Sequence, residues 1–261
     1  MMNLLIKAIR RLTRGWKDSL GLNMKTIHLV TVLGVLAAVS STPVPAWAAE
    51  TDGVAVAIVY DTSGSMKEQV RDGAGNLTSK YVIANRALEN IATRIQAFAT
   101  NTTTGTPRNI QAGLFVFDGA NTKQAVKFGP FDAAAFKDWA RKFSTPDGGT
   151  PLGNALTEAG KTVLNSGLTR KHVLIITDGN NTLGPTPAKT MPQVKQQAAA
   201  KQTDISVHFV AFDVDASVFS GVKKLGATVV GAADEIQLNK QLEFILEKKI
   251  LLEDEEPPKK Q

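Results

Sequence analysis

The chain has 261 residues, of which 43% are hydrophobic and 21% are charged, a composition typical of a globular protein. By its length it holds one ordinary domain with appendages, or at most two small domains. The 21 glycines and 11 prolines are too few for a collagen-like or low-complexity chain. Because cysteine is absent, disulfide bonds, thiolate metal sites, cysteine nucleophiles and lipid attachment through cysteine are excluded.

The net charge of +6 does not indicate a nucleic-acid partner, because the excess lies at one end of the chain. Residues 1–48 contain six of the 30 lysines and arginines but one of the 24 acidic residues, which leaves 24 basic and 23 acidic side chains beyond them. The rest of the chain is therefore nearly neutral, and we expect no nucleic-acid binding.

The N-terminal part has the pattern of an export signal. An apolar run over residues 27–39 is shorter than the roughly 20 residues that cross a membrane, and Ala46-Trp47-Ala48 follows it as a small-x-small cleavage site. This pattern predicts a secretory signal cleaved after Ala48, with an uncleaved membrane anchor as the alternative. We expect an exported bacterial protein, periplasmic or extracellular, with no stable membrane span after cleavage; it stays membrane-anchored if the signal is not cleaved.

Residues 1–23 precede what would already be a complete signal beginning at Met24-Lys25. One interpretation places the true start of the protein at Met24. The other is that residues 1–23 form a basic amphipathic helix on anionic lipid, because apolar residues recur there at helical spacing among lysines and arginines.

Beyond the signal, short apolar runs alternate with amphipathic stretches, which predicts βα units and a mainly parallel sheet. The continuous apolar sequence of the first run is typical of a strand buried on both faces. We expect strands over residues 54–60, 110–117, 125–128, 173–177, 205–212 and 228–230. We expect helices over residues 79–100, 132–143, 191–202, 219–225 and 234–252, with one more opening at Pro151.

The predicted fold class is α/β: a doubly wound, mostly parallel central sheet with helices on both faces and one antiparallel edge strand. The antiparallel strand is expected because the short connection Asp118-Gly119-Ala120-Asn121 suits a hairpin. The predicted organisation is an N-terminal extension and signal over residues 1–48, one domain over 49–252, and a disordered charged tail over 253–261.

Polar side chains gather where the strands are expected to end. Asp61, Ser63 and Ser65 follow the first strand, Thr150 precedes a helix, and Asp178 follows a later strand. Since ligands bind at the carboxyl ends of the strands in such sheets, we expect these loops to meet at one edge. All of these side chains offer oxygen, the atom that hard divalent cations such as Mg²⁺ prefer.

The spacing of the first loop suits an ion. Alternate residues of Asp61-x-Ser63-x-Ser65 can face one cation if the loop curls, and Gly64 permits a tight curve. If the hydroxyls bind directly and the carboxylates bind through water, the ion keeps much of its charge and lacks one ligand. An anionic group of a partner is the natural sixth ligand. Asp178-Gly179 alone also suits a structural turn, whereas no turn requires the hydroxyls of the first loop.

At these residues the sequence resembles the von Willebrand factor type A (vWA) domain family. Its metal ion-dependent adhesion site (MIDAS) has the pattern Asp-x-Ser-x-Ser, followed by a distant Thr and a distant Asp. The resemblance spans about residues 53–250. All five positions of the pattern are filled, by Asp61, Ser63, Ser65, Thr150 and Asp178.

The resemblance implies a doubly wound fold with Mg²⁺ or Mn²⁺, ahead of Ca²⁺, at the top of the sheet. It implies recognition of an Asp or Glu carboxylate on a partner protein. It also implies that Ser63, Ser65 and Thr150 bind the ion directly, and that Asp61 and Asp178 act directly or through water.

In well-studied members of the family, binding is coupled to movement of the last helix. The corresponding predicted helix in this chain covers residues 234–252. Core packing is the simpler interpretation of its Leu238, Leu242 and Ile245. A switch would require two states that the ligand binds unequally.

Two polar stretches flank the predicted site, residues 71–80 and 179–189, and both are long for βα connections. They are expected either to select the partner or to be plain surface loops. In the first case Arg71, Lys80 or Lys189 could attract an acidic surface.

The main functional hypothesis is a non-enzymatic, exported vWA domain protein that binds its partner through the metal. One alternative is a magnesium-dependent phosphohydrolase of haloacid dehalogenase type. That chemistry uses the first Asp as nucleophile and normally a second Asp two residues later, where this chain has Ser63, and no lysine stands in an obvious phosphate-neutralising context. The other alternative is a vWA scaffold with a non-functional metal site. His172 and His208 are expected to be packed or exposed rather than catalytic.

Overall fold

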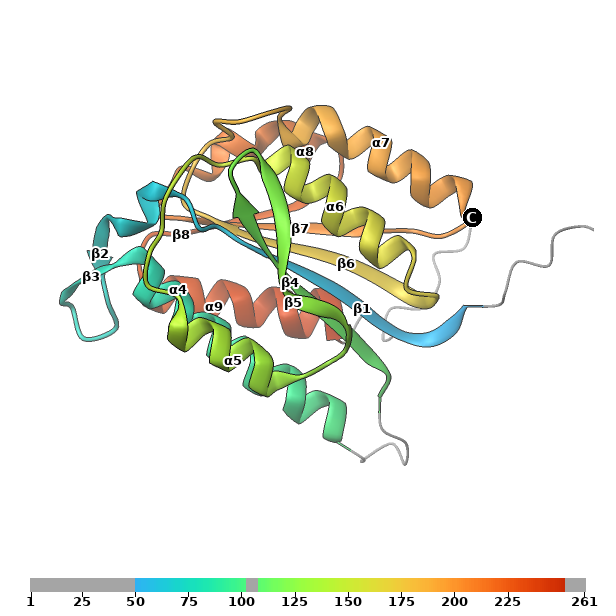
Figure 1. Ribbon diagram of the computed structural model, residues 1–261, viewed down its shortest axis with the longest axis horizontal. Helices are drawn as coiled ribbons and strands as arrows, with labels where there is room; N and C mark the ends of the chain where they lie inside the picture. The colour runs from blue at the N-terminus through green and yellow to red at the C-terminus, as the bar shows by residue number, and fades with distance from the viewer. Residues whose placement is uncertain (1–49, 102–107, 252–261) are drawn as a thin grey trace, which may run out of the picture. The chain divides into compact units, whose positions relative to one another are not determined.

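Strand β1 (Thr51–Tyr60) lies inside the sheet of the computed structural model, which describes residues 50–101 and 108–251. This part belongs to one compact unit, and its main sheet has the strand order β5-β4-β1-β6-β7-β8 (Figure 1). The expectations for the signal over residues 1–48, and for the tail over 253–261, lie outside the described residues. The strands beside β1 are β4 (Ile110–Asp118), β5 (Asn121–Pro130), β6 (Leu168–Thr177), β7 (Ser206–Phe212) and β8 (Thr228–Ala232).

The pairing of the strands has the predicted mixture of directions. Strand β1 pairs in parallel with β4 and β6, and β7 and β8 continue the parallel arrangement, while β5 pairs antiparallel with β4 at one edge. Asp118 pairs with Asn121, and Gly119, with a φ of +61°, takes the first position of the turn between them. The predicted fold class and the predicted hairpin are confirmed.

Helices cover both faces of the sheet (Figure 1). Alternate residues of β1 enter two separate cores: Val56 and Ile58 face one side, and Ala57 and Val59 face the other. All four are fully buried, as expected for a strand covered on both faces. One face holds α4 (Lys80–Thr100), α5 (Ala133–Lys142) and α9 (Glu235–Ile245), and the other holds α6 (Leu152–Leu164), α7 (Pro187–Ala200) and α8 (Ser220–Lys224).

The start of one helix matches its predicted capping residue, and the start of another differs from the prediction. The Asp132 carboxylate accepts hydrogen bonds from two backbone N–H groups in the first turn of α5, at 3.0 and 3.1 Å, so its predicted capping role is confirmed. Helix α7 begins at Pro187, and the predicted start at residue 191 is wrong. Proline is well tolerated in the first turn, where its missing N–H has no helical partner, but Pro192 inside the helix obscured the pattern.

The stretch at 71–80 is not a plain loop. Strand β2 (Gln69–Arg71) pairs antiparallel with β3 (Leu77–Ser79), and the Asp72 carboxylate accepts two backbone hydrogen bonds of 2.9 Å within the turn between them. The hairpin follows the short 3₁₀ helix η1 (Gly64–Lys67) in the chain and leads directly into α4. It therefore brings the first residue of α4 back beside the loop that follows β1.

The last helix is shorter than predicted and changes its geometry. Helix α9 ends at Ile245 and continues as a π-helix, η3 (Leu246–Leu251). Leu238, Leu242 and Ile245 are buried in the core on the α4 side, which confirms the packing interpretation of these residues.

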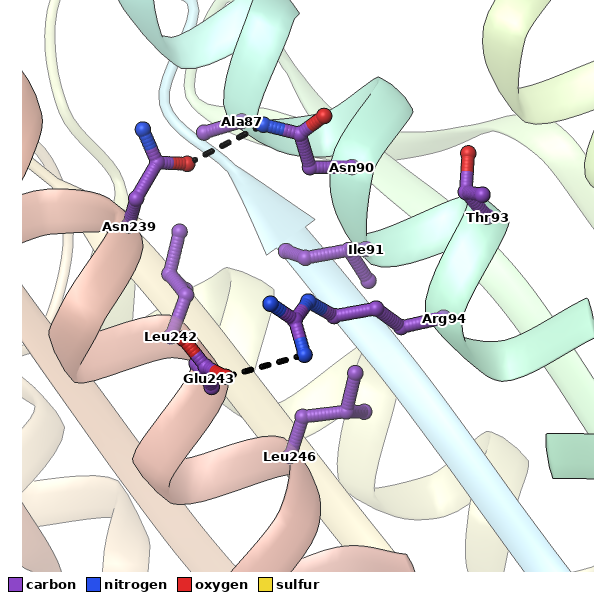
Figure 2. A pocket seen from close by; sticks show the side chains of 9 residues that line it. All are labelled: Ala87, Asn90, Ile91, Thr93, Arg94, Asn239, Leu242, Glu243 and Leu246. Carbon is purple, nitrogen blue, oxygen red and sulfur yellow. Dashed lines mark hydrogen bonds and ion pairs between the residues drawn. The ribbon is translucent and has the colours of Figure 1, made fainter. Parts of the chain in front are cut away.

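A groove of about 270 Å³ separates α4 from α9 (Figure 2). Figure 2 shows Arg94 of α4 reaching across it to Glu243 of α9, at an ion-pair distance of 3.0 Å. Nearby, the Asn90 amide donates a hydrogen bond of 3.3 Å to the Asn239 side chain. These contacts hold the two helices together.

Candidate metal centre

The carboxylate of Asp61 opens the loop that follows β1 and is fully buried. It accepts hydrogen bonds from the backbone N–H of Ser63 at 2.8 Å and from the hydroxyl of Thr177 at 2.5 Å. Since Thr177 is the last residue of β6, these bonds tie the ends of two neighbouring strands together. The orientation of the Asp61 carboxylate is therefore set by the protein itself.

The two serines connect the first loop to the loop after β6. The hydroxyl oxygens of Ser63 and Ser65 lie 3.1 Å apart. The Ser65 hydroxyl donates to Oδ1 of Asp178 at 2.8 Å. Asp61, Ser63, Ser65 and Asp178 thus form one polar cluster at the carboxyl ends of β1 and β6.

The loop that carries Thr150 lies between the other two. The backbone N–H of Gly64 donates to the carbonyl of Gly148 at 3.0 Å, which joins this loop to the first one. On its other side, the backbone N–H of Thr182 donates to the carbonyl of Thr150 at 3.0 Å. The Thr150 side chain is consequently held at the same edge of the sheet, where it is 3% exposed.

Gly179 gives a direct measure of how closely the three loops converge. A Cβ atom built at Gly179 would lie 3.7 Å from Oγ of Ser65 and 3.9 Å from Oγ1 of Thr150. Hydroxyls from two separate loops therefore border one small space beside the backbone of the third loop. The structure brings all five predicted residues together, and their binding of an ion stays a prediction.

Negative charge in this cluster is costly. Burial, together with the charge of Asp178, raises the pKa of Asp61 from its ordinary value to about 6. Burial also raises the pKa of Asp178, although hydrogen bonds from Ser65 and Lys80 partly offset this effect. A divalent cation placed between the carboxylates would relieve this cost.

The donor set fits a hard divalent cation such as Mg²⁺ or Mn²⁺. Three hydroxyl oxygens and two carboxylates converge, and such cations prefer oxygen ligands. Within residues 50–101 and 108–251, no group of three or more His, Asp or Glu side chains is arranged to hold a metal ion. An ion at this edge would therefore depend on the hydroxyls of Ser63, Ser65 and Thr150.

The pKa of Asp61 sets an expected pH dependence. Because metal ligands must be deprotonated, protons compete with the ion once the pH falls below the Asp61 pKa of about 6. We expect the dissociation constant for Mn²⁺ to be constant above pH 7 and to rise about tenfold per pH unit below pH 6. Calorimetric titrations between pH 5 and 8 measure this, and an affinity that is the same at both ends would contradict the role of Asp61.

Lys80, which the sequence analysis named only as a possible contact for a partner, lies beside the cluster. Its ammonium is buried and lies 3.2 Å from Oδ2 of Asp178. Burial alone lowers the pKa of Lys80, but hydrogen bonds to Glu68 and Asp213 and the charge of Asp178 raise it above its ordinary value, so the side chain stays charged. The expectation that Lys80 could attract a partner's acidic surface is wrong, because a side chain surrounded by the protein's own carboxylates is not available to a partner.

Glu68 and Asp213 are the residues near the cluster that sequence reasoning missed. Glu68 follows η1, Asp213 follows β7, and both carboxylates contact the ammonium of Lys80, at 2.7 and 3.0 Å. The position of Asp213 after a parallel strand was a usable signal, since the same rule placed Asp61 and Asp178 at this edge.

The histidines lie away from this edge. His172 and His208 are buried on the neighbouring strands β6 and β7, with their rings stacked at a centroid distance of 5.6 Å. Nδ1 of His172 lies 3.3 Å from Nε2 of His208. This placement agrees with the expectation that they are packed residues.

Fold and loops together define a doubly wound α/β domain with an oxygen-rich cluster at the carboxyl ends of its central strands. The chain belongs to the von Willebrand factor type A domain family, whose family model matches residues 55–240.

Comparison with known proteins supports this placement. The uncharacterized protein YwmC of Bacillus subtilis is 27% identical over 204 residues, which cover 72% of this chain and 81% of that protein. The PilB minor pilin from Streptococcus sanguinis has a TM-score of 0.59 and 18% identity, over 82% of this chain and 65% of the pilin. Proximal thread matrix protein 1 from the mussel byssus, with a zinc-occupied MIDAS motif, has a TM-score of 0.54 and 17% identity, over 77% of this chain and 49% of that protein.

At these identities the two solved structures show the fold alone. The chain spans less than two thirds of the length of either of them.

Proposed function

We propose that this chain is a non-enzymatic binding module that holds Mg²⁺ or Mn²⁺ through Asp61, Ser63, Ser65, Thr150 and Asp178. In this proposal the Asp or Glu carboxylate of a partner protein completes the coordination of the ion. The observation that carries it is the convergence of the Ser65 and Thr150 hydroxyls on the space beside Gly179. Two further findings support it: domains of this family mediate interactions between proteins, and one solved structure of the same fold holds zinc at its MIDAS motif.

The chemistry of the cluster favours binding over catalysis. Asp61 would be the nucleophile of a phosphohydrolase, yet its side chain is fully buried and both of its oxygens accept hydrogen bonds. Lys80 lies near the strand ends, but its charge is directed at the protein's own carboxylates rather than at a phosphate. The haloacid dehalogenase alternative therefore has no support in the geometry.

Export from the cytoplasm is part of the proposal. It rests on the signal pattern of residues 27–48 and on the similarity of the fold to a minor pilin. Among the helices of the described ranges, none is both long enough and apolar enough to cross a bilayer.

Partner capture tests the proposal. The tagged protein is incubated with a native envelope fraction, in parallel with Mg²⁺ and with a chelator, and the retained proteins are identified. We expect a specific partner that is retained with Mg²⁺, released by chelator and absent from a Thr150→Val variant. Conversion of an acidic residue of that partner to its amide is expected to abolish retention. Capture that is indifferent to both the chelator and the variant would contradict the proposal.

An enzymatic outcome has a separate signature. Steady release of phosphate from a phosphate monoester, lost in Asp61→Asn, would favour the phosphohydrolase instead.

A further inference from the structure

Lys80 is surrounded by three carboxylates that come from three different loops. Its Nζ lies 2.7 Å from Glu68, 3.0 Å from Asp213 and 3.2 Å from Asp178, and its side chain is 3% exposed. Lysines are almost never this buried unless they are paired. One ammonium against three carboxylates leaves the group with an excess of negative charge.

The three carboxylates differ in how much they depend on Lys80 to balance their charge. The side chains of Glu68 and Asp213 are 66% and 39% exposed, so water solvates them as well. The Asp178 side chain is 0% exposed. Its charge is balanced from within the protein, and Lys80 supplies the nearest positive charge.

Asp178 links Lys80 to the metal centre. Oδ2 of Asp178 accepts from the ammonium of Lys80, while Oδ1 accepts from the hydroxyl of Ser65. The plane of this carboxylate is therefore set from both ends. Lys80 acts on the centre through Asp178 and is a positioning residue for it.

The surrounding backbone holds Lys80 and its partners in place. The backbone N–H of Lys80 donates to the carbonyl of Glu68 at 2.8 Å, at the base of the β2–β3 hairpin. Asp213 has a φ of 52°, an uncommon left-handed conformation for a residue other than glycine, and its N–H donates to the carbonyl of Ala232 at 2.7 Å. The protein thus accepts a strained backbone where a carboxylate faces Lys80.

We propose that Lys80 is a resident counter-cation of the metal centre, which holds Asp178 in place without an ion and lowers the affinity of the centre for divalent cations. This inference rests on the proposed function, because it concerns the ion bound there. The ammonium and the ion repel each other across Asp178, and this repulsion is strong in a buried site. A more weakly held ion depends more on the partner's carboxylate, so that the ion and the partner stabilise each other on the protein.

Replacement of Lys80 by a neutral side chain of similar length tests the proposal. The affinity for Mn²⁺ is measured by calorimetric titration of the full protein, and the melting temperature is measured in chelator. We expect Lys80→Met to bind Mn²⁺ at least about tenfold more tightly than the wild type. We also expect it to melt at a lower temperature without metal, because Asp178 loses its counter-charge.

A second variant is expected to change the affinity for Mn²⁺ in the opposite direction. Its substituted side chain is partly exposed, so the substitution does not disturb a buried position. Asp213→Asn removes one negative charge near Lys80, and asparagine tolerates the left-handed backbone well. We expect this variant to bind Mn²⁺ about threefold or more weakly than the wild type. A purely structural role of Lys80 predicts instead that Lys80→Met binds Mn²⁺ as the wild type does or more weakly.

Lys171 provides a matched control. Its side chain is also fully buried and is bound to Glu50 at 2.6 Å and to Thr203 at 2.9 Å, but it lies in the first half of β6, away from the loop edge. We expect Lys171→Met to lower the melting temperature and to leave the affinity for Mn²⁺ unchanged.

The outcomes separate the two proposals. Wild-type protein that binds no Mn²⁺ would overturn the proposed function and this inference together. Wild-type binding with unchanged or weaker binding by Lys80→Met would overturn this inference alone. If Lys80→Met does not fold, unchanged or tighter binding by Asp213→Asn overturns it.

Discussion

Millimolar Mg²⁺ or Mn²⁺ is expected to raise the melting temperature of the protein by about 5–10 °C. A ligand at about 100 times its dissociation constant stabilises the folded state by about 2.7 kcal/mol, and for a domain of this size each kcal/mol corresponds to about 2–4 °C. The physical reason is the pair of buried carboxylates, because burial raises the pKa of both Asp61 and Asp178 and a bound cation would relieve the cost of burying their charge. Differential scanning calorimetry with and without metal measures the shift.

The shift is expected to vanish when chelator is added in excess of the metal. It is also expected to be larger at pH 7.5 than at pH 5, because Asp61 is protonated in the more acidic buffer. A melting temperature that does not respond to metal at neutral pH would contradict a functional centre and favour a vWA scaffold with a non-functional site.

Thr150→Val is expected to weaken Mn²⁺ binding at least about 100-fold. Loss even of groups that merely support metal ligands costs about 10–100-fold in affinity, and Thr150 is proposed as a direct ligand. Valine has nearly the same shape as threonine, so the variant removes the hydroxyl and little else. We therefore expect its melting temperature without metal to change by less than about 3 °C.

Thr157→Val is the matched control for this substitution. Thr157 lies on α6, and its hydroxyl donates to the carbonyl of Gly153 in the same helix at 2.9 Å, so it has no part in the loop cluster. The Thr157→Val variant is expected to bind Mn²⁺ with wild-type affinity. Equal binding by both variants would show that the hydroxyl of Thr150 is not a ligand.

The central part of the fold could be predicted because the local signals and the packing agree. The apolar run of β1 ends at Asp61, and a buried parallel strand requires apolar residues on both faces. Strand β5 (Asn121–Pro130) was expected only over residues 125–128. As an edge strand it is largely solvent-accessible and carries polar residues such as Lys123 and Lys127, so its ends lack an apolar signal.

One topological rule was enough to predict part of the candidate site from the sequence. Asp61 and Asp178 both follow parallel strands, and the carboxyl ends of those strands meet at one edge. Lys80 could not be found in this way, because it opens a helix and lies 98 residues from Asp178 in sequence. Only the β2–β3 hairpin brings it back, and the turn that begins at Asp72 was the one local sign of that hairpin.

A crystal structure of the protein grown with Mn²⁺ would show, through the anomalous signal of the metal, whether the three loops together bind an ion. We expect a single strong peak at the loop edge, about 2.0–2.2 Å from the hydroxyl oxygens of Ser63, Ser65 and Thr150, with one coordination position open to solvent. A peak at another place, or Thr150 turned away from an ion held only by carboxylates, would contradict this expectation.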